Sequence, residues 1–259
     1  MKLTFIGAGS AFANHNENYN SNLLLESPKN SEKLLVDCGC DARHALLDLG
    51  YTYKDISAVY ISHLHFDHVG GLEWLGLTTK FDPSCQRPRL FIHEKVADII
   101  WDTTLRGSMA CLEEEEATLE TYFDLKSSNS SFLWNDVKFN MVKMIHVYNK
   151  DKPQPCYGLE FSFGSKNIFF TGDTRFDLDR LLPYYNKADI IFQDTETLPF
   201  KSSVHCHYSE IVALPKSIKK KMWLYHYNAG QLPDCKKDGF RGYVQRRQVF
   251  DLEKKETYL

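Results

Sequence analysis

The stretch SHLHFDHVGG, residues 62–71, decides the fold. It follows a short apolar run with the composition of a buried β-strand. Because side chains alternate along a strand, His63 and His65 point the same way at its end, and the chain then turns so that Asp67 and His68 approach from a second direction. Imidazole and carboxylate ligands without thiolate suit zinc, iron or manganese. The segment therefore predicts a metal centre for two adjacent ions, in preference to a loop of surface histidines.

Short strand-like and helix-like runs surround this stretch. Upstream, apolar runs separated by Gly, Asn, Ser and Pro predict three strands and then a helix: Leu3–Ile6, Ser21–Glu26, Lys33–Val36 and Ala42–Leu49. Downstream of the strand Ala58–Ile61, we expect a helix, a strand and a helix: Leu72–Leu77, Arg89–Ile92 and Glu94–Leu105. We further expect a helix over Met109–Leu125, with the acidic run Glu113–Glu116 on a solvated face, and a polar turn at Ser127–Ser131.

A second series of strands occupies the rest of the chain. The predicted strands are Phe132–Leu133, Val137–Ile145, Tyr157–Phe163, Asn167–Thr171, Ile190–Phe192 and Met222–Tyr225. The same order, consecutive strands followed by alternating strands and helices, thus occurs twice in the chain. No low-complexity linker separates the two series. We expect a single α/β domain over residues 1–259, with helices outside two packed sheets.

Composition excludes several classes of protein. With 259 residues, of which 43% are hydrophobic and 14% aromatic, the chain buries a sizeable core and is not disordered as a whole. Lys plus Arg number 31 against 34 for Asp plus Glu, so bulk nucleic-acid binding is not expected. The sequence shows neither a signal-peptide core nor about 18 consecutive apolar residues, so we expect a cytoplasmic protein with no membrane partner. The seven cysteines form no C-x-x-C pair and are expected to be buried thiols.

The H-x-H-x-D-H pattern of residues 63–68 closely resembles that of the metallo-β-lactamase fold. LLVDCG, a lone His146, TGDT with Asp173 and a late His226 follow in that family's order. The resemblance implies a four-layer αββα sandwich of two mixed sheets flanked by helices. It also implies two Zn²⁺ per chain, with Mn²⁺ or Fe as alternatives. One metal would be held by His63, His65 and His146, the other by Asp67, His68 and His226, with Asp173 bridging both. Asp37 would orient a ligand, or would simply form a turn before Gly39.

Two further segments resemble the ribonuclease Z-like phosphodiesterase branch of that fold. GAGSAF at residues 7–12 is similar to its glycine-rich loop, whereas a dinucleotide-binding loop would need glycine where Phe12 stands. In that branch a His-Glu pair ends a strand, and a later His completes the proton donor. Here Gln193 and Asp194 replace that pair. The resemblance implies that His205 is the acid and Asp194 orients it. His207 is the alternative acid, and both histidines could instead lie in a polar loop.

These features predict a dinuclear metal-dependent hydrolase. A metal-bridging hydroxide, with Asp67 as a polar partner, would attack a small phosphodiester or a cyclic nucleotide, and His205 would protonate the leaving oxygen. The chain lacks the long glycine-rich and basic insertion expected of a transfer-RNA nuclease. A ribonuclease Z-type endoribonuclease and a thioester, lactone or other carboxyl-ester hydrolase remain alternatives. A diiron redox protein is disfavoured, because that branch carries Glu where His65 stands.

The resemblance suggests two further features, a homodimer and a substrate-binding rim. The rim residues lie in the loop after the first strand: Phe12, Asn14, His15 and Asn16. His44 and His93 are expected to be structural or exposed and not to be ligands.

Overall fold

The first β-sheet of the computed structural model, which describes residues 1–14, 18–113, 115–254 and 256–259, has eight strands. In sheet order these are β17 (Glu256–Tyr258), β16 (Val249–Asp251), β1 (Lys2–Gly7), β2 (Asn22–Glu26), β3 (Lys33–Val36), β4 (Ala58–Ile61), β5 (Arg89–His93) and β6 (Asp124–Ser128). The strands β3 to β6 run parallel. All four residues of β4 are buried, as is usual for a strand inside a parallel sheet covered on both faces.

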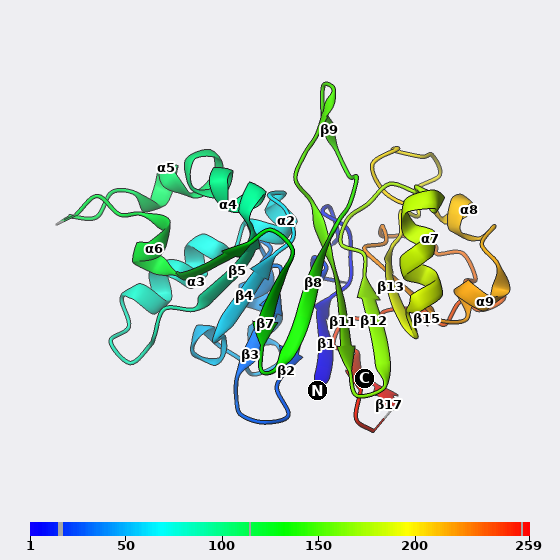
Figure 1. Cartoon of the computed structure of the whole chain (residues 1–259), viewed down its shortest axis with the longest axis horizontal. Helices are drawn as coiled ribbons and strands as arrows, with labels where there is room; N and C mark the ends of the chain where they lie inside the picture. The colour runs from blue at the N-terminus through cyan, green and yellow to red at the C-terminus, as the bar shows by residue number, and fades with distance from the viewer. Residues whose placement is uncertain (15–17, 114, 255) are drawn as a thin grey trace.

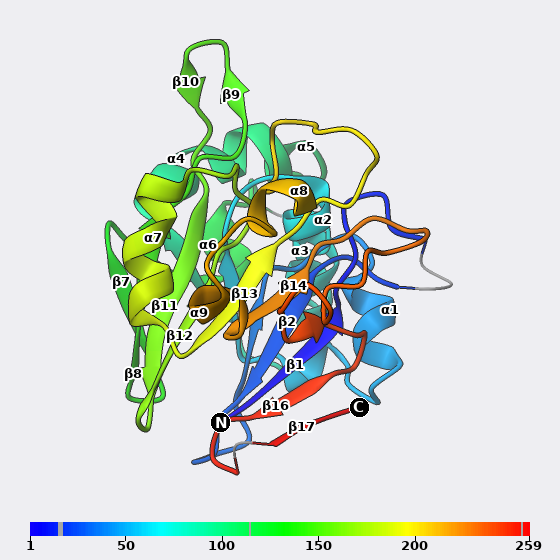
Figure 2. The same cartoon turned by 90° about the vertical axis from the view of Figure 1, so that its right-hand side faces the viewer.

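The second sheet has seven strands. In sheet order these are β15 (Gly242–Tyr243), β14 (Met222–Tyr225), β13 (Ile190–Asp194), β12 (Lys166–Phe170), β11 (Tyr157–Phe163), β8 (Val137–Lys143) and β7 (Ser131–Trp134). Because β12, β13 and β14 run parallel, their carboxyl ends meet at one edge of the sheet. A separate hairpin of β9 (Tyr148–Asn149) and β10 (Lys152–Pro153) stands out from the body of the molecule (Figure 2).

Helices cover the outer side of each sheet (Figure 1). On the side of the first sheet these are α1 (Ala42–Leu47), η1 (Tyr53–Asp55), α3 (Leu72–Lys80), α4 (Glu94–Ile100), the π-helical η2 (Trp101–Leu105), α5 (Arg106–Met109) and α6 (Leu119–Tyr122). On the side of the second sheet they are α7 (Leu178–Lys187), α8 (Tyr208–Ile211) and α9 (Lys216–Lys219). The short α2 (Phe66–Val69) follows β4 directly. This arrangement confirms the predicted four layers.

Aromatic side chains hold the two sheets together. Phe5 on β1 contacts Phe192 on β13, with ring centroids 5.1 Å apart, and Tyr225 on β14 at 5.7 Å. Phe170 in turn stacks on Tyr225 at 4.9 Å. All four side chains are fully or almost fully buried. Burying aromatic area between the sheets stabilises their packing, and it brings the carboxyl edges of the two sets of parallel strands next to one another.

Two sequence predictions between residues 109 and 131 are wrong. A continuous helix over Met109–Leu125 is absent from the described residues, because α5 ends at Met109, only the four-residue α6 follows, and β6 begins at Asp124. The acidic run offers no apolar face for a helix to bury, whereas Leu119, Tyr122 and Phe123 do pack into the core. The predicted turn at Ser127–Ser131 is reduced to two residues between β6 and β7. At the edge of its sheet, β6 tolerates exposed serines.

Among the helices that the structure describes, none combines the length and the apolar character needed to span a membrane.

Candidate metal centre

The polar residues of the site lie just beyond the carboxyl ends of strands from both sheets. In the first sheet, Asp37 follows β3 and His63 comes two residues after β4. In the second sheet, Asp173 follows β12, Asp194 ends β13 and His226 follows β14. Parallel strands place such residues along one edge, and the packing of the two sheets brings the two edges together.

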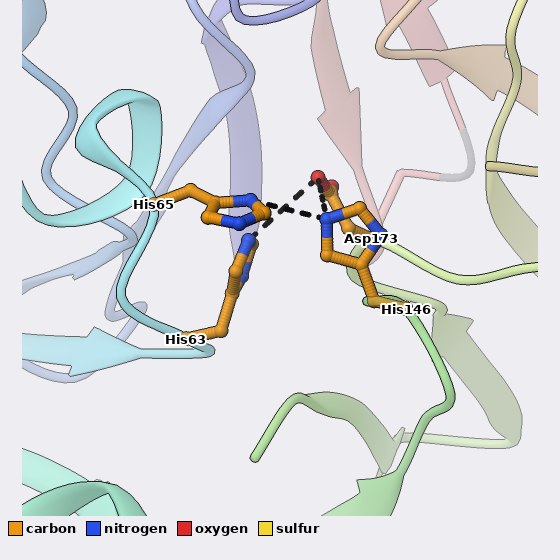
Figure 3. Close-up of side chains that lie close together, drawn as sticks. All are labelled: His63, His65, His146 and Asp173. Atoms are coloured by element: carbon orange, nitrogen blue, oxygen red, sulfur yellow. Dashed lines mark hydrogen bonds and ion pairs between the residues drawn. The ribbon is translucent and has the colours of Figure 1, made fainter. Parts of the chain in front are cut away.

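One group of potential ligands consists of His63, His65, His146 and Asp173, which offer nitrogen or oxygen atoms within 4.8 Å of one another. Figure 3 shows that the two residues from the 62–71 stretch approach from one side and His146 and Asp173 from the other. His146 Nε2 lies 3.1 Å from His65 Nδ1 and 3.6 Å from Asp173 Oδ2. His63 Nε2 lies 3.8 Å from the same oxygen. His65 is exposed and the other three are buried, so the group opens to solvent at His65.

A second group consists of Asp67, His68, Asp173 and His226, all buried. Asp67 Oδ2 lies 3.1 Å from His68 Nε2 and 3.2 Å from His226 Nε2. Asp173 Oδ2 lies 3.3 Å and 3.4 Å from the same two nitrogens. Among the described residues, Asp173 is the one that these two groups share, which places it to bridge two ions.

The chemistry of these donors fits metal ions. His63 Nε2, Asp67 Oδ1 and Asp173 Oδ1 are buried and have no hydrogen-bond partner within the described part of the chain, and His68 Nε2 has only its ion-pair contacts with the two carboxylates. Leaving such atoms unpaired costs about 1–3 kcal/mol each, and more for a charged group. A divalent cation bound among these atoms would coordinate them and neutralise the charge of the carboxylates. The cluster is therefore a divalent-metal site.

The electrostatics keep His63, His146 and Asp67 in the forms that bind metal, whereas at His68 burial is outweighed by neighbouring carboxylates, which hold its pKa well above the usual value. Burial lowers the pKa of His146 to about 3 and holds the pKa of His63 well below its usual value, so both imidazoles are neutral. Burial opposes ionisation of Asp67, but His68 and His226 hold the pKa of its carboxyl below the usual range. Neutral imidazole and ionised carboxylate are the ligand forms required.

Asp37 holds His68 in place. Its Oδ2 lies 2.8 Å from His68 Nδ1, and its two oxygens accept hydrogen bonds from the backbone N–H and the hydroxyl of Ser62, each at 2.8 Å. Asp37 has a φ of 62°, an uncommon left-handed conformation for a residue other than glycine. The expectation that Asp37 orients a ligand is met. Ser62, which also contacts His63 Nδ1 at 3.0 Å, was not singled out from the sequence.

Asp194 and His205 form a pair beside the second group. His205 Nδ1 lies 2.9 Å from Asp194 Oδ2 and 3.9 Å from Asp173 Oδ2. Burial opposes the protonated imidazole, but the Asp194 carboxylate raises the pKa of His205 to about 9. Asp194 also accepts from the backbone N–H of Thr174 at 2.9 Å and lies 3.4 Å from His226 Nδ1. The pair places a protonated imidazole next to the cluster at neutral pH.

The structure does not bring His207 to this pair. Its Nε2 lies 2.8 Å from the carbonyl oxygen of Leu198, and its Nδ1 lies 2.8 Å from the hydroxyl of Ser209 at the start of α8. Both ring nitrogens are thus engaged in holding the loop before α8. A role in proton transfer at the cluster has no geometric support.

Besides Ser62, sequence reasoning missed two further groups that position the site. The carbonyl oxygen of Val204 lies 2.7 Å from His146 Nδ1 and orients that ring. The buried Glu196 accepts the backbone N–H of Ser202 at 2.9 Å and so fixes the loop that carries His205. A backbone carbonyl leaves no signal in a sequence, whereas the acidic residue two positions after Asp194 could have been noticed.

The remaining sequence candidates lie outside the two groups. His93 caps α4 and stacks on Tyr157 with ring centroids 3.7 Å apart, and His44 is exposed on α1, as expected for residues that are not ligands. Phe12 is exposed and Asn14 lines a small cavity beside Tyr227. The predictions for His15 and Asn16 lie outside the described residues. Each of the seven cysteines is a free thiol, but Cys40 and Cys111 are exposed and Cys85 is only partly buried, contrary to expectation.

Comparison with solved structures supports the fold. The chain superposes with a TM-score of 0.74 on the metallo-β-lactamase fold protein YhfI from Bacillus subtilis, at 22% identity and covering 96% of this chain and 99% of that one. A diphosphatase of the PhnP family gives 0.70 at 17% identity, covering 96% and 95%. The short form of human tRNase Z gives 0.67 at 18% identity, covering 97% and 99%. The predicted metallo-β-lactamase sandwich is confirmed.

Comparison at the level of sequence is more specific. The model of the family described as Anti-Pycsar protein Apyc1 matches residues 1–250. A protein of that name from Paenibacillus harenae is 34% identical over 231 residues, which cover 88% of this chain and 90% of the relative. Together with the metal cluster, these matches show that the chain is a metal-dependent hydrolase of the metallo-β-lactamase fold and belongs to the Anti-Pycsar Apyc1 family.

Proposed function

We propose that the chain is a dinuclear zinc phosphodiesterase that hydrolyses a small phosphodiester, and specifically a cyclic mononucleotide. The observation that carries this proposal is the Asp194–His205 pair, whose ring nitrogen lies 3.9 Å from the shared Asp173. Hydrolysis of a ribose phosphodiester expels an alkoxide, which needs a proton as it leaves. Hydrolysis of a thioester has less need of such a donor, because a thiolate is the more stable leaving group.

In this proposal each of the two groups holds one ion. His63, His65 and His146 would hold the first and Asp67, His68 and His226 the second, with Asp173 shared. When bound, a pair of divalent cations supplies Lewis acidity toward the phosphoryl oxygens and activates an attacking water. Mn²⁺ or Fe in place of Zn²⁺ is chemically compatible with the same nitrogen and oxygen donors.

The protein's own groups orient the reactants and move the proton. The Asp67 carboxylate stays ionised and can accept a hydrogen bond from the attacking water. His205, protonated at neutral pH, donates its proton to the departing oxygen. Asp194 keeps the Nδ1 side of the His205 ring occupied at 2.9 Å, which leaves Nε2 as the donor toward substrate.

A small substrate fits this chain better than a folded RNA. The net charge of −3 supplies no basic field. Between His146 and Asp173 the described chain adds only the short hairpin β9–β10 to the sheet strands β11 and β12. The relatives carry the name anti-Pycsar protein. We propose the same role for this chain, exercised by hydrolysis of a cyclic mononucleotide.

A substrate panel with metal-loaded protein tests the proposal. Cyclic mononucleotides and bis(p-nitrophenyl) phosphate should be cleaved much faster than p-nitrophenyl phosphate, because a dianionic monoester presents extra charge to the site. Precursor transfer RNA at physiological salt should react poorly. Activity confined to thioesters or lactones would replace the proposal with the carboxyl-ester alternative, and efficient precursor processing would replace it with the ribonuclease alternative.

We also propose that the chain forms a homodimer, as the family resemblance suggests. Light scattering of the purified protein should then give twice the chain mass of 30.0 kDa. A mass equal to that of one chain would contradict the dimer without affecting the proposed chemistry.

A further inference from the structure

Two phenylalanines form an exposed pair on the surface of the protein. Phe12 is 86% exposed and Phe66 is 47% exposed. Their ring centroids lie 6.1 Å apart and the ring planes meet at 44°. Contiguous exposed apolar surface is a feature of binding sites, whereas apolar residues scattered singly over a surface are ordinary. We call these two residues the aromatic pair.

The two members of the aromatic pair belong to segments that carry or contact residues of the metal centre. Phe66 stands between His65, the exposed member of the first group, and the buried Asp67 of the second. Phe12 comes from the loop after β1, where the backbone N–H of Ser10 donates to the carbonyl oxygen of Tyr227 at 3.1 Å. Tyr227 directly follows His226, so the pair joins the two segments that supply Asp67 and His226.

A phosphodiester substrate would make two kinds of contact, one through its phosphate and one through the rest of the molecule. The phosphate of a phosphodiester belongs among the buried nitrogens and carboxylates, where cations are bound. A substrate group that extends from the cluster past the exposed His65 comes next to Phe66, the following residue in the chain. Aromatic side chains stack on any nucleobase, because every base has a π-face. A sugar phosphate or an alkyl phosphodiester has no planar group to place there.

We propose that Phe12 and Phe66 form a stacking platform for the nucleobase, so that the substrates are nucleotides and other phosphodiesters lacking an aromatic group bind poorly. This inference rests on the proposed phosphodiesterase function and names the part of the substrate that the site recognises. It also assigns a contact to Phe66, which lies inside the ligand motif but has no ligand atom. The preference is for an aromatic base of any identity, since stacking reads no hydrogen-bond pattern.

The test compares a 3′,5′-cyclic mononucleotide with the corresponding base-free ribose 3′,5′-cyclic phosphate in wild type and Phe12→Ala. Loss of a stacking contact should raise KM for the nucleotide by roughly 5- to 150-fold, leave kcat nearly unchanged, and leave KM for the base-free substrate unchanged. Phe12→Trp should retain the wild-type KM. Phe81→Ala removes a phenylalanine that is 66% exposed at the end of α3 and should change neither substrate.

A second measurement separates failure of this inference from failure of the proposed function. Calorimetric binding of a nucleoside 5′-monophosphate should weaken in Phe12→Ala while binding of ribose 5-phosphate does not, and this holds whether or not the wild type turns over a phosphodiester. Equal losses for the two ligands, or no loss for either, would overturn the platform. Phe12→Ala could instead halve the mass in light scattering and raise KM equally for both substrates. That result would contradict the platform and would make the aromatic pair a subunit contact.

Discussion

The segments 62–71 and 194–207 bring polar side chains to the same centre, but they satisfy those side chains differently. In the first, buried atoms of His63 and Asp67 lack hydrogen-bond partners among the described residues. In the second, Asp194 and His205 satisfy one another at 2.9 Å. The first segment is therefore complete only with cations, whereas the second is already formed without them. Ligand binding and proton donation can thus be disrupted separately.

The largest effect should come from breaking the first segment. Asp67→Ala removes a proposed ligand of the second group and the carboxylate proposed to accept a hydrogen bond from the attacking water. We expect the metal content to fall from two ions toward one and turnover to fall by about 10⁴-fold or more, because charge stabilisation and water activation are lost together at about 1.36 kcal/mol per decade. Elemental analysis and steady-state kinetics on one preparation measure both. Full activity in this variant would remove the 62–71 segment from catalysis.

Breaking the second segment should spare the metals. His205→Ala should lower kcat by about 10²- to 10⁴-fold on a cyclic nucleotide, whose alkoxide needs the proton, and far less on bis(p-nitrophenyl) phosphate, whose phenolate leaves unaided. Metal content should stay at the wild-type value. His207→Ala is the companion variant, and a leaving-group-dependent loss there would transfer the acid role to His207. Equal slowing of both substrates by His205→Ala would make His205 a positioning residue.

A smaller effect should follow from loosening a ligand without removing it. Asp37→Asn keeps the shape of the residue that holds His68 but removes its charge, and we expect metal affinity to fall by about 10- to 100-fold. Competition with a chelator of known affinity measures the change. Asp136→Asn is a matched control, because Asp136 is exposed and has a φ of 63°, close to the 62° of Asp37. A comparable loss of affinity in the control would place the effect in the backbone and not at His68.

The smallest effect is a change in pH dependence. The pKa of His205 is raised to about 9, so the imidazole is protonated below that pH and loses its proton as the pH rises through it. Bound cations lower the value, so kcat/KM for a cyclic nucleotide should decline on the alkaline side with an apparent pKa at or below about 9. The profile of His205→Ala should lack this decline. An unchanged alkaline limb in the variant would assign the titration to another group.

Local pattern was sufficient where a segment buries itself or carries its own chemistry. Ala58–Ile61 is apolar throughout and forms β4 with the predicted bounds, and the His and Asp spacing after it led directly to a metal centre. The helix expected over Met109–Leu125 failed because neighbouring elements decide that region. Phe123 and Tyr122 pack into the core, and Asp124–Ser128 pairs with β5 as an edge strand. The sequence of residues 109–125 alone does not show that β5 is available as a pairing partner for the strand that follows.

The sequence by itself gathered His63, His65, Asp67 and His68 into one cluster, because ligand side chains after a buried strand are a local feature. The sandwich and the more distant candidate ligands came from the resemblance to the metallo-β-lactamase family. Only the tertiary structure decided how distant residues meet. It pairs Asp194 with His205, turns His207 toward Leu198, and sets Phe12 against Phe66. The physical reason is the packing of two sheets through their aromatic core, which aligns the carboxyl ends of their parallel strands at one edge and so joins loops that lie far apart along the chain.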